Sequence, residues 1–158
     1  MKKVVSLLSG GIDSLTAMVW AFRQDFQVIG LHFNYGQLTE KKEFEMFLEQ
    51  CKFYGIEKRF TINLPHYKSL HSSALTGDLP FTFASKENPV PSSYVPFRNA
   101  TLLSYATAIA EAEDCEGITI GVFAGDSPDY PDCSESFIEA FQKVIYIGTA
   151  KKNIRIFA

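Results

Sequence analysis

The sequence is poor in several features that would point to particular classes of protein. Its three cysteines, Cys51, Cys115 and Cys133, are widely spaced and include no CxxC pair, so they form no complete metal site and are typical of a reducing compartment. No apolar run approaches the roughly 20 residues that cross a membrane, and the amino-terminal run is too short for a signal peptide. The formal net charge of −3 argues against a broad nucleic-acid-binding surface. We therefore expect a cytoplasmic protein with a small-molecule substrate, bound to neither nucleic acid nor membrane.

The sequence is rich in the residues that build a folded core. Apolar residues make up 46% of the 158 residues and aromatic residues 14%, which excludes a disordered chain. The apolar pattern predicts strands over 4–8, 27–34, 59–64, 117–122 and 153–157. Helices are expected between them, over 15–22, from a Thr39 cap to about 54, from an Asn99 cap to about 113, and over 137–148. This alternation predicts an α/β fold, a Rossmann-like doubly wound parallel sheet of about five strands.

The segment from about 65 to 98 lacks this regularity, because five prolines interrupt it. A loop of this length inside a compact domain is usually functional. We expect one domain over 1–158, with this loop helping to bind substrate at the carboxyl ends of the strands, where ligands bind in such sheets. Because 153–157 reads as a last strand and domains seldom end on one, we also expect further chain beyond Ala158.

A glycine-rich turn follows the first predicted strand, with the sequence Ser9-Gly10-Gly11-Ile12-Asp13-Ser14. The glycines allow positive φ and a close approach of backbone to ligand, and the N–H groups at the start of the next helix favour an anion. The serines add hydroxyl donors. The turn lacks the Gly-Lys-Ser/Thr of a Walker A loop and is not a GxGxxG turn. We predict a phosphate-binding loop; the alternative is a plain Gly-Gly turn in which Asp13 only starts the helix.

The motif SGGxDS after a first strand resembles the signature of the PP-loop ATP pyrophosphatases. Three further segments resemble motifs of one family among them, the 7-cyano-7-deazaguanine synthase (QueC) family. They are Phe33-Asn34-Tyr35-Gly36-Gln37, then Tyr94-Val95-Pro96-Phe97-Arg98-Asn99, and a stretch from Gly121 to Phe137 that is similar to GVxxxDxxxYPDCxxxF. The motifs occur in the family's order, and the resemblance covers essentially the whole chain.

This resemblance implies an ATP-dependent carbon–nitrogen ligase that converts 7-carboxy-7-deazaguanine and ammonia to the nitrile in queuosine biosynthesis. It also implies ATP and Mg²⁺ as cofactors and a homodimer. The family's four-cysteine zinc site would lie beyond residue 158, so Zn²⁺ is expected only there, and no metal site is expected within this chain. Two alternatives stay open: a relative that joins a related carboxylated base to another amine, and a nucleotide-binding fragment without turnover.

Residue by residue, the resemblance assigns ATP binding to Leu8, Ser9, Gly10, Gly11, Ile12, Asp13, Ser14, Leu15 and Gln37. The catalytic candidates are Asp13, Arg98 and Asp132, with Asp13 as a Mg²⁺ partner or loop organiser. Substrate contacts are expected from Phe97, Arg98, Asp126, Tyr130 and Asp132.

Several of these residues have simpler interpretations. Arg98 could be a surface arginine, and Asp132 could only cap the last helix, because Glu135 follows it by three residues. Phe97 and Tyr130 could belong to the core, and Cys133 is either a nucleophile or an inert buried thiol. The chain also departs from the family pattern at Phe97, where glycine is usual, at Ser134, where arginine is usual, and at Phe123. These departures leave the acceptor substrate open.

Overall fold

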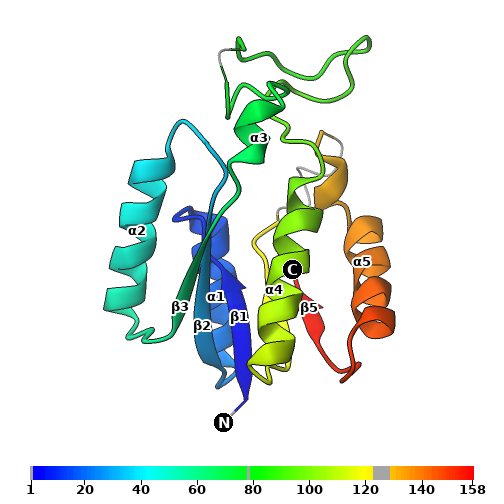
Figure 1. Cartoon of the computed structure of the whole chain (residues 1–158). Coiled ribbons are helices and arrows are strands. Elements are labelled where there is room, and N and C mark those ends of the chain that lie inside the picture. Colours follow the sequence, from blue (N-terminus) through cyan, green and yellow to red (C-terminus); the bar gives the residue numbers. More distant parts are fainter. Residues whose placement is uncertain (1, 78, 123–128) are drawn as a thin grey trace.

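The computed structural model describes residues 2–77, 79–122 and 129–158. Its strands form one parallel sheet in the order β3-β2-β1-β4-β5, which confirms the predicted fold class (Figure 1). In register, Val5 on β1 lies opposite Ile29 on β2 and Ile118 on β4. The strands are β1 (Lys3–Leu7), β2 (Gln27–Asn34), β3 (Arg59–Asn63), β4 (Gly117–Thr119) and β5 (Arg155–Phe157).

Helices cover both faces of this sheet. They are α1 (Ile12–Arg23), α2 (Glu40–Phe53), the short α3 (His66–Ser69), α4 (Arg98–Ala112) and α5 (Glu135–Gly148), with a 3-10 turn, η2 (Pro131–Cys133), before α5. Right-handed crossovers from β1 to β2 and β3 place α1 and α2 on one face, and those to β4 and β5 place α4 and α5 on the other. No described helix is long and apolar enough to cross a membrane.

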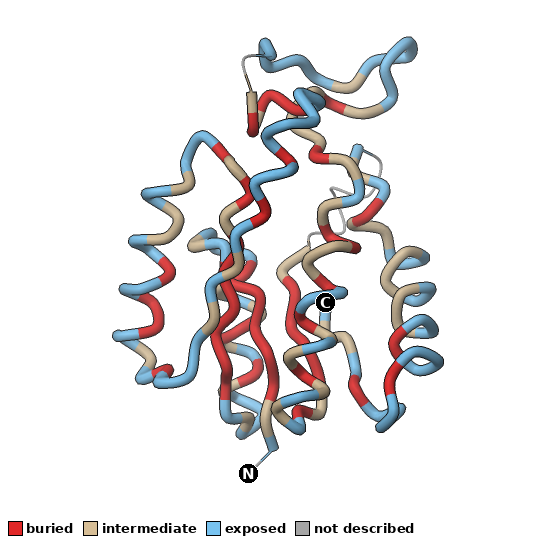
Figure 2. Tube along the Cα trace, viewed as in Figure 1, coloured by how far each residue is buried: buried red, intermediate tan, exposed pale blue. Residues whose placement is uncertain are grey.

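The core forms two layers because alternate residues of each strand point to opposite faces. Val4, with Met18 and Phe47, belongs to the cluster beneath α1 and α2. Its neighbour Val5, with Leu103, belongs to the cluster beneath α4 and α5. Figure 2 shows the central strands as almost continuously buried. This two-sided burial explains why the strands read as apolar runs rather than as alternating patterns.

The local predictions differ from the structure at two helix starts and at the end of one strand. Thr39 does precede α2, but its hydroxyl donates to Glu43 Oε1 (2.5 Å) and caps no backbone amide. The predicted Asn99 cap of α4 is wrong, because α4 begins at Arg98 and Phe97 occupies the cap position with a left-handed backbone (φ 55°, ψ 28°). Strand β4 is also shorter than predicted, since it ends at Thr119.

The loop from 70 to 97 rises above the carboxyl edge of the sheet (Figure 1). Local hydrogen bonds order it. The hydroxyl of Ser92 accepts from the Thr82 N–H (2.7 Å) and donates to the Pro80 carbonyl (2.9 Å), while the Ser92 carbonyl accepts from the Ala74 N–H (2.7 Å). The predicted irregular segment of 65–98 therefore contains the short helix α3, and after it an ordered loop over its described residues.

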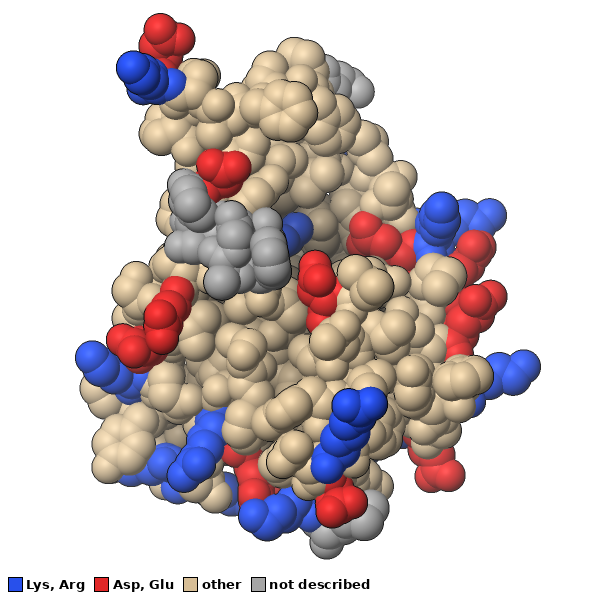
Figure 3. Space-filling view, turned by 180° about the vertical axis from the view of Figure 1, so that it is seen from behind, with Lys and Arg blue, Asp and Glu red and all other residues tan. Residues whose placement is uncertain are grey.

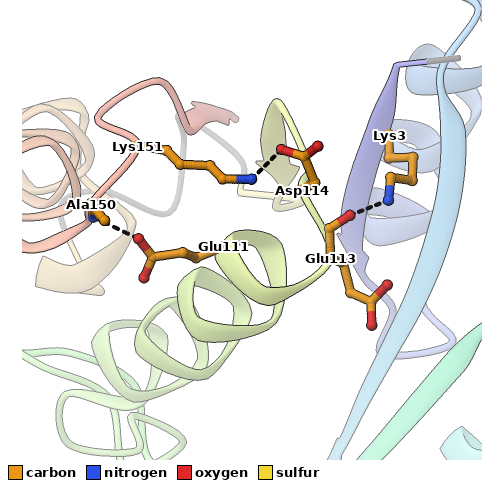
Figure 4. Close-up of polar contacts among 6 residues, drawn as sticks. All are labelled: Lys3, Glu111, Glu113, Asp114, Ala150 and Lys151. Carbon is orange, nitrogen blue, oxygen red and sulfur yellow. Dashed lines mark hydrogen bonds and ion pairs between the residues drawn. The ribbon is translucent and has the colours of Figure 1, made fainter.

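At the opposite, amino edge of the sheet, polar contacts connect the end of α4 to neighbouring segments (Figure 4). Lys3 on β1 donates to the Glu113 carbonyl, and Lys151 pairs with Asp114. The Ala150 N–H donates to Glu111 Oε1 (2.6 Å). Exposed ion pairs of this kind contribute little stability. They tie α4 and the turn before β5 to the sheet, and the carboxyl edge stays available for a ligand.

Phe97 provides a test of the backbone at the start of α4. A non-glycine residue in the left-handed region costs about 1 kcal/mol. Phe97→Gly should therefore be more stable than Phe97→Ala by about 1 kcal/mol, measured by urea unfolding. The comparison is matched, because both variants lose the edge-on contact between Phe97 and Phe137 (centroids 6.3 Å apart). Equal stability of the two variants would contradict a left-handed conformation at this residue.

Candidate active site

The loop between β1 and α1 is held in place by its own serines. Ser9 Oγ and Ser14 Oγ lie 3.1 Å apart, and Ser14 Oγ also donates to the Gly11 carbonyl (3.0 Å). Gly10 has φ +83°, and a Cβ there would lie 2.9 Å from the Glu43 carbonyl oxygen. Since the first N–H groups of a helix have no acceptor within it, the start of α1 presents free donors beside a rigid loop.

Gly121, just after β4, lies directly behind this loop. A Cβ at Gly121 would come within 2.4 Å of the Asp13 carbonyl carbon and 2.5 Å of the Ser14 nitrogen. Below this contact, Ser6 Oγ on β1 and Thr119 Oγ1 on β4 are 2.6 Å apart in the buried sheet. The strand order reverses between β1 and β4, which is where open α/β sheets bind their ligands.

Two further side chains fix the entry to the loop. The buried ring of His32 contacts the Leu8 carbonyl through Nδ1 (2.7 Å) and Asn34 Oδ1 through Nε2 (3.1 Å), and it stacks on Phe47. Gln50 Nε2 donates to the Gly10 carbonyl (3.2 Å). His32 therefore has a structural role.

A cavity of about 290 Å³ opens beside the loop at the carboxyl ends of β1, β2 and β4. Its walls are mainly apolar, and one acidic and one basic side chain, Glu43 and Arg98, face it. The lining residues are Leu7, Leu8, Ser9, Ser14, Leu31, Phe33, Tyr35, Glu43, Leu75, Arg98, Asn99, Leu102, Ile120 and Gly121. The structure thus brings the predicted Leu8, Ser9, Ser14 and Arg98 together around one space.

Arg98 begins α4 and lies against Tyr35. Its Nη1 donates to the Tyr35 hydroxyl (2.9 Å), and its guanidinium lies 5.3 Å from the centre of the Tyr35 ring. Its Nε is buried and has no hydrogen-bond partner among the described residues. Burial works against the charge, but Tyr35 and, more weakly, Asp132 raise the pKa of Arg98 above its ordinary value. Arg98 is therefore a charged residue of the cavity lining, held by Tyr35.

Asp132 supports the same helix start. Its Oδ2 accepts from the Asn99 N–H (2.8 Å), and its carbonyl accepts from Asn99 Nδ2 (3.0 Å). The interpretation of Asp132 as a cap of the last helix is wrong, because Ser134 Oγ caps α5 by accepting from the Phe137 N–H (3.2 Å). Asp132 is buried and is not among the residues that line the cavity. It holds the first turn of α4 from behind Arg98.

The other predicted ligand residues lie outside this cavity. Gln37 points into the protein, Tyr130 bonds Ser93 through its hydroxyl (2.7 Å), and Phe97 is 63% exposed. Asp13 faces a second cavity, of about 640 Å³, on the other side of the loop. Asp126 and Phe123 lie outside the described residues.

The sequence pattern did not single out Tyr35 or Glu43, which both line the cavity. Tyr35 stands in a recognised motif, but the resemblance assigned only Gln37 of that motif to ATP binding. Glu43 carried no signal, since a glutamate early in a helix is common. Among the described residues, no group of three or more His, Cys, Asp or Glu side chains could hold a metal ion.

The sheet order and the glycine-rich loop at the point where that order reverses define an α/β protein with a Rossmann-like, doubly wound parallel sheet. A solved 4-thiouridine synthetase–RNA complex with bound ATP shares this fold with a TM-score of 0.55; it is 18% identical, over 98% of this chain and 36% of that chain.

The chain belongs to the QueC family, since the family of queuosine biosynthesis protein QueC matches residues 3–158. Two relatives are named 7-cyano-7-deazaguanine synthase. The one from Nautilia profundicola is 42% identical over 158 residues, which are 99% of this chain and 71% of the relative. The one from Methanoculleus marisnigri is 47% identical over 152 residues, which are 95% and 68%. The chain is therefore related to enzymes of queuosine biosynthesis.

The packing behind the loop predicts the effect of one added methyl group. Gly121→Ala should lower the free energy of unfolding by about 2 kcal/mol, because the loop backbone cannot yield as a flexible side chain would. Gly148→Ala is the matched control, since a Cβ there meets nothing within 4 Å and alanine favours the helix. Urea unfolding measures both; equal stabilities would mean that the loop does not rest on Gly121.

Proposed function

We propose that the chain binds ATP at the Ser9–Ser14 loop and uses it to activate the carboxylate of 7-carboxy-7-deazaguanine for reaction with ammonia, giving the nitrile. One observation carries the proposal. Arg98 lines a cavity that also reaches Ser9 and Ser14 of the glycine-rich loop, so one space brings a cation and a phosphate-binding loop together. Membership of the QueC family supports the choice of reaction.

The loop supplies the phosphate site. Ser9, Gly10, Gly11, Ile12, Asp13 and Ser14, flanked by Leu8 and Leu15, would surround the phosphates, with the amino terminus of α1 favouring negative charge. The related fold that holds ATP in the 4-thiouridine synthetase complex supports this assignment. The exposed carboxylate of Asp13 suits a Mg²⁺ partner or an organiser of the loop, and a bound Mg²⁺ would neutralise phosphate charge.

The chemistry needs ATP because a carboxylate is a poor electrophile. A carboxylate oxygen attacks the α-phosphorus, pyrophosphate leaves, and the acid becomes an acyl adenylate. Ammonia displaces AMP to give the amide, which a second ATP activates for loss of water to the nitrile. Because the two reactants are both anionic, the protein must bring them together and neutralise their charge. Arg98 is the side chain that performs this task in the proposed site.

The surroundings of the cavity suit a small substrate. The loop over 65–98 contributes Leu75 to the wall. Asp126, Tyr130 and Phe97 are proposed contacts to the base, and Gln37 borders the ATP side by holding Glu43 (2.9 Å). Acidic and basic side chains are interspersed over the face drawn in Figure 3, which does not favour binding of a polyanion there.

The family resemblance adds a cytoplasmic homodimer to the proposal. The buried thiols of Cys51 and Cys115 suit a reducing compartment. Burial raises the pKa of Cys115 to about 11, so this thiol is not a nucleophile near neutral pH. No step is assigned to zinc, because the described residues provide no group of zinc ligands.

The proposal is tested by incubating the purified protein with ATP, 7-carboxy-7-deazaguanine and ammonium, followed by mass spectrometry. We expect AMP, pyrophosphate and the nitrile. AMP that forms only with another amine would support a different acceptor. Binding of ATP without AMP under any of these conditions would identify a nucleotide-binding protein without turnover.

Asp13→Ala tests the loop assignment. We expect turnover to fall by at least about a hundredfold, because removing a group that organises transition-state charge costs about 3 kcal/mol. The fold should remain intact, since Asp13 is exposed. Glu139→Ala is the control and should retain full activity, because Glu139 is an exposed carboxylate on α5, which covers the opposite face of the sheet from α1 (Figure 1). Full activity in Asp13→Ala would contradict the assignment.

A further inference from the structure

Arg98 is held by a neutral partner. Among the described residues, the ion pairs involve Lys2, Lys58 and Lys151, and none involves Arg98. The Arg98 side chain instead donates a hydrogen bond to the phenol of Tyr35, whose ring also lies under the guanidinium. An arginine that donates to a phenol keeps its full charge, whereas one that donates to a carboxylate is largely neutralised.

Tyr35 is itself immobile. Its side chain is buried, its backbone N–H donates to Gln37 Oε1 (2.8 Å), and its ring meets Tyr67 edge-on at 6.3 Å. Burial, with a smaller effect from Glu43, raises the pKa of Tyr35 above its ordinary value although Arg98 lowers it. The phenol is therefore protonated at neutral pH, and the oxygen that accepts from Arg98 stays at one place in the cavity wall.

Glu43, the acidic residue in the lining of the same cavity, is held by hydrogen bonds to Gln37 and Thr39. Glu43 Oε2 accepts from Gln37 Nε2 (2.9 Å) and its Oε1 accepts from Thr39 (2.5 Å). A glutamate free to turn would be attracted to Arg98 and would remove the positive charge from the site. The side chain of Gln37 thus has two effects. Its Oε1 fixes Tyr35 by accepting from the backbone N–H, and its Nε2 restrains Glu43.

We propose that Tyr35 is a positioning residue that holds Arg98 in the cavity lining with its charge intact for an anionic ligand. The inference rests on the proposed function for the identity of that ligand, the carboxylate of the substrate or the α-phosphate of ATP. The arrangement of Tyr35, Arg98, Gln37 and Glu43 is independent of that identity.

The test is a double-mutant cycle on equilibrium binding, measured by calorimetry with 7-carboxy-7-deazaguanine and separately with ATP. Tyr35→Phe keeps the ring but removes the hydroxyl. We expect it to weaken the ligand that Arg98 binds by about tenfold, the effect of one hydrogen bond to a charged group. In an Arg98→Ala background the same change should cost less than about twofold, because Tyr35 acts through Arg98. Under turnover, the KM for that ligand should rise while kcat changes little.

Tyr67→Phe is the matched control. Tyr67 is as buried as Tyr35 and loses a comparable hydrogen bond, to Thr101 Oγ1 (2.7 Å), but its hydroxyl does not contact Arg98. It should lower stability without changing the affinity for either ligand. A purely structural Tyr35 would behave in the same way as Tyr67.

The outcomes separate the two proposals. If the protein does not bind the carboxylated base, the proposed substrate is wrong, and the cycle is decided with ATP alone. If Tyr35→Phe costs the same with and without Arg98, or costs nothing, Tyr35 does not position Arg98. If Arg98→Ala changes the binding of neither ligand, Arg98 holds no anion and the positioning role is also wrong.

Discussion

The site depends on the absence of a side chain at Gly121. The loop after β1 can lie over the end of β4 only because its backbone at Asp13 and Ser14 touches Gly121 directly. That contact lets the loop lie directly on the end of β4, and Gly10 lets the same loop pack closely against α2. The start of α1, the serine hydroxyls and the cavity wall follow from these two contacts. A phosphate site is thus built largely from backbone, with side chains fixing the backbone.

Charge in the cavity follows a second rule, which is that the ligand-facing groups are held by neutral partners. Arg98 is bound by a phenol and Glu43 by an amide and a hydroxyl; behind the cavity, Asp132 accepts from a backbone amide. Buried charges normally need pairing. Here the hydrogen bonds lower the cost of burial without cancelling the charge, so the site keeps an affinity for an anion that a set of ion pairs would lose.

The sequence predicted the features that depend on neighbours along the chain. The parallel sheet, β2 over its full length, and the loop of Ser9 to Ser14 all followed from local pattern and motif. What could not be predicted depends on contacts between distant residues. Asp132 supports Asn99 from 33 residues away, and Tyr35 meets Arg98 from 63 residues away. No local rule shows that Tyr35 faces the cavity and that Gln37, two residues later, faces the interior.

The same contacts bear on the choice of substrate. Three departures from the family pattern kept a different acceptor open, and two of them have local explanations. Phe97 occupies a left-handed position that glycine would adopt without strain, and it lies outside the cavity. Ser134 caps α5 through its hydroxyl. Neither changes the described wall of the site. The third, Phe123, lies outside the described residues. The described cavity, with Arg98 as its cation, suits an anionic group.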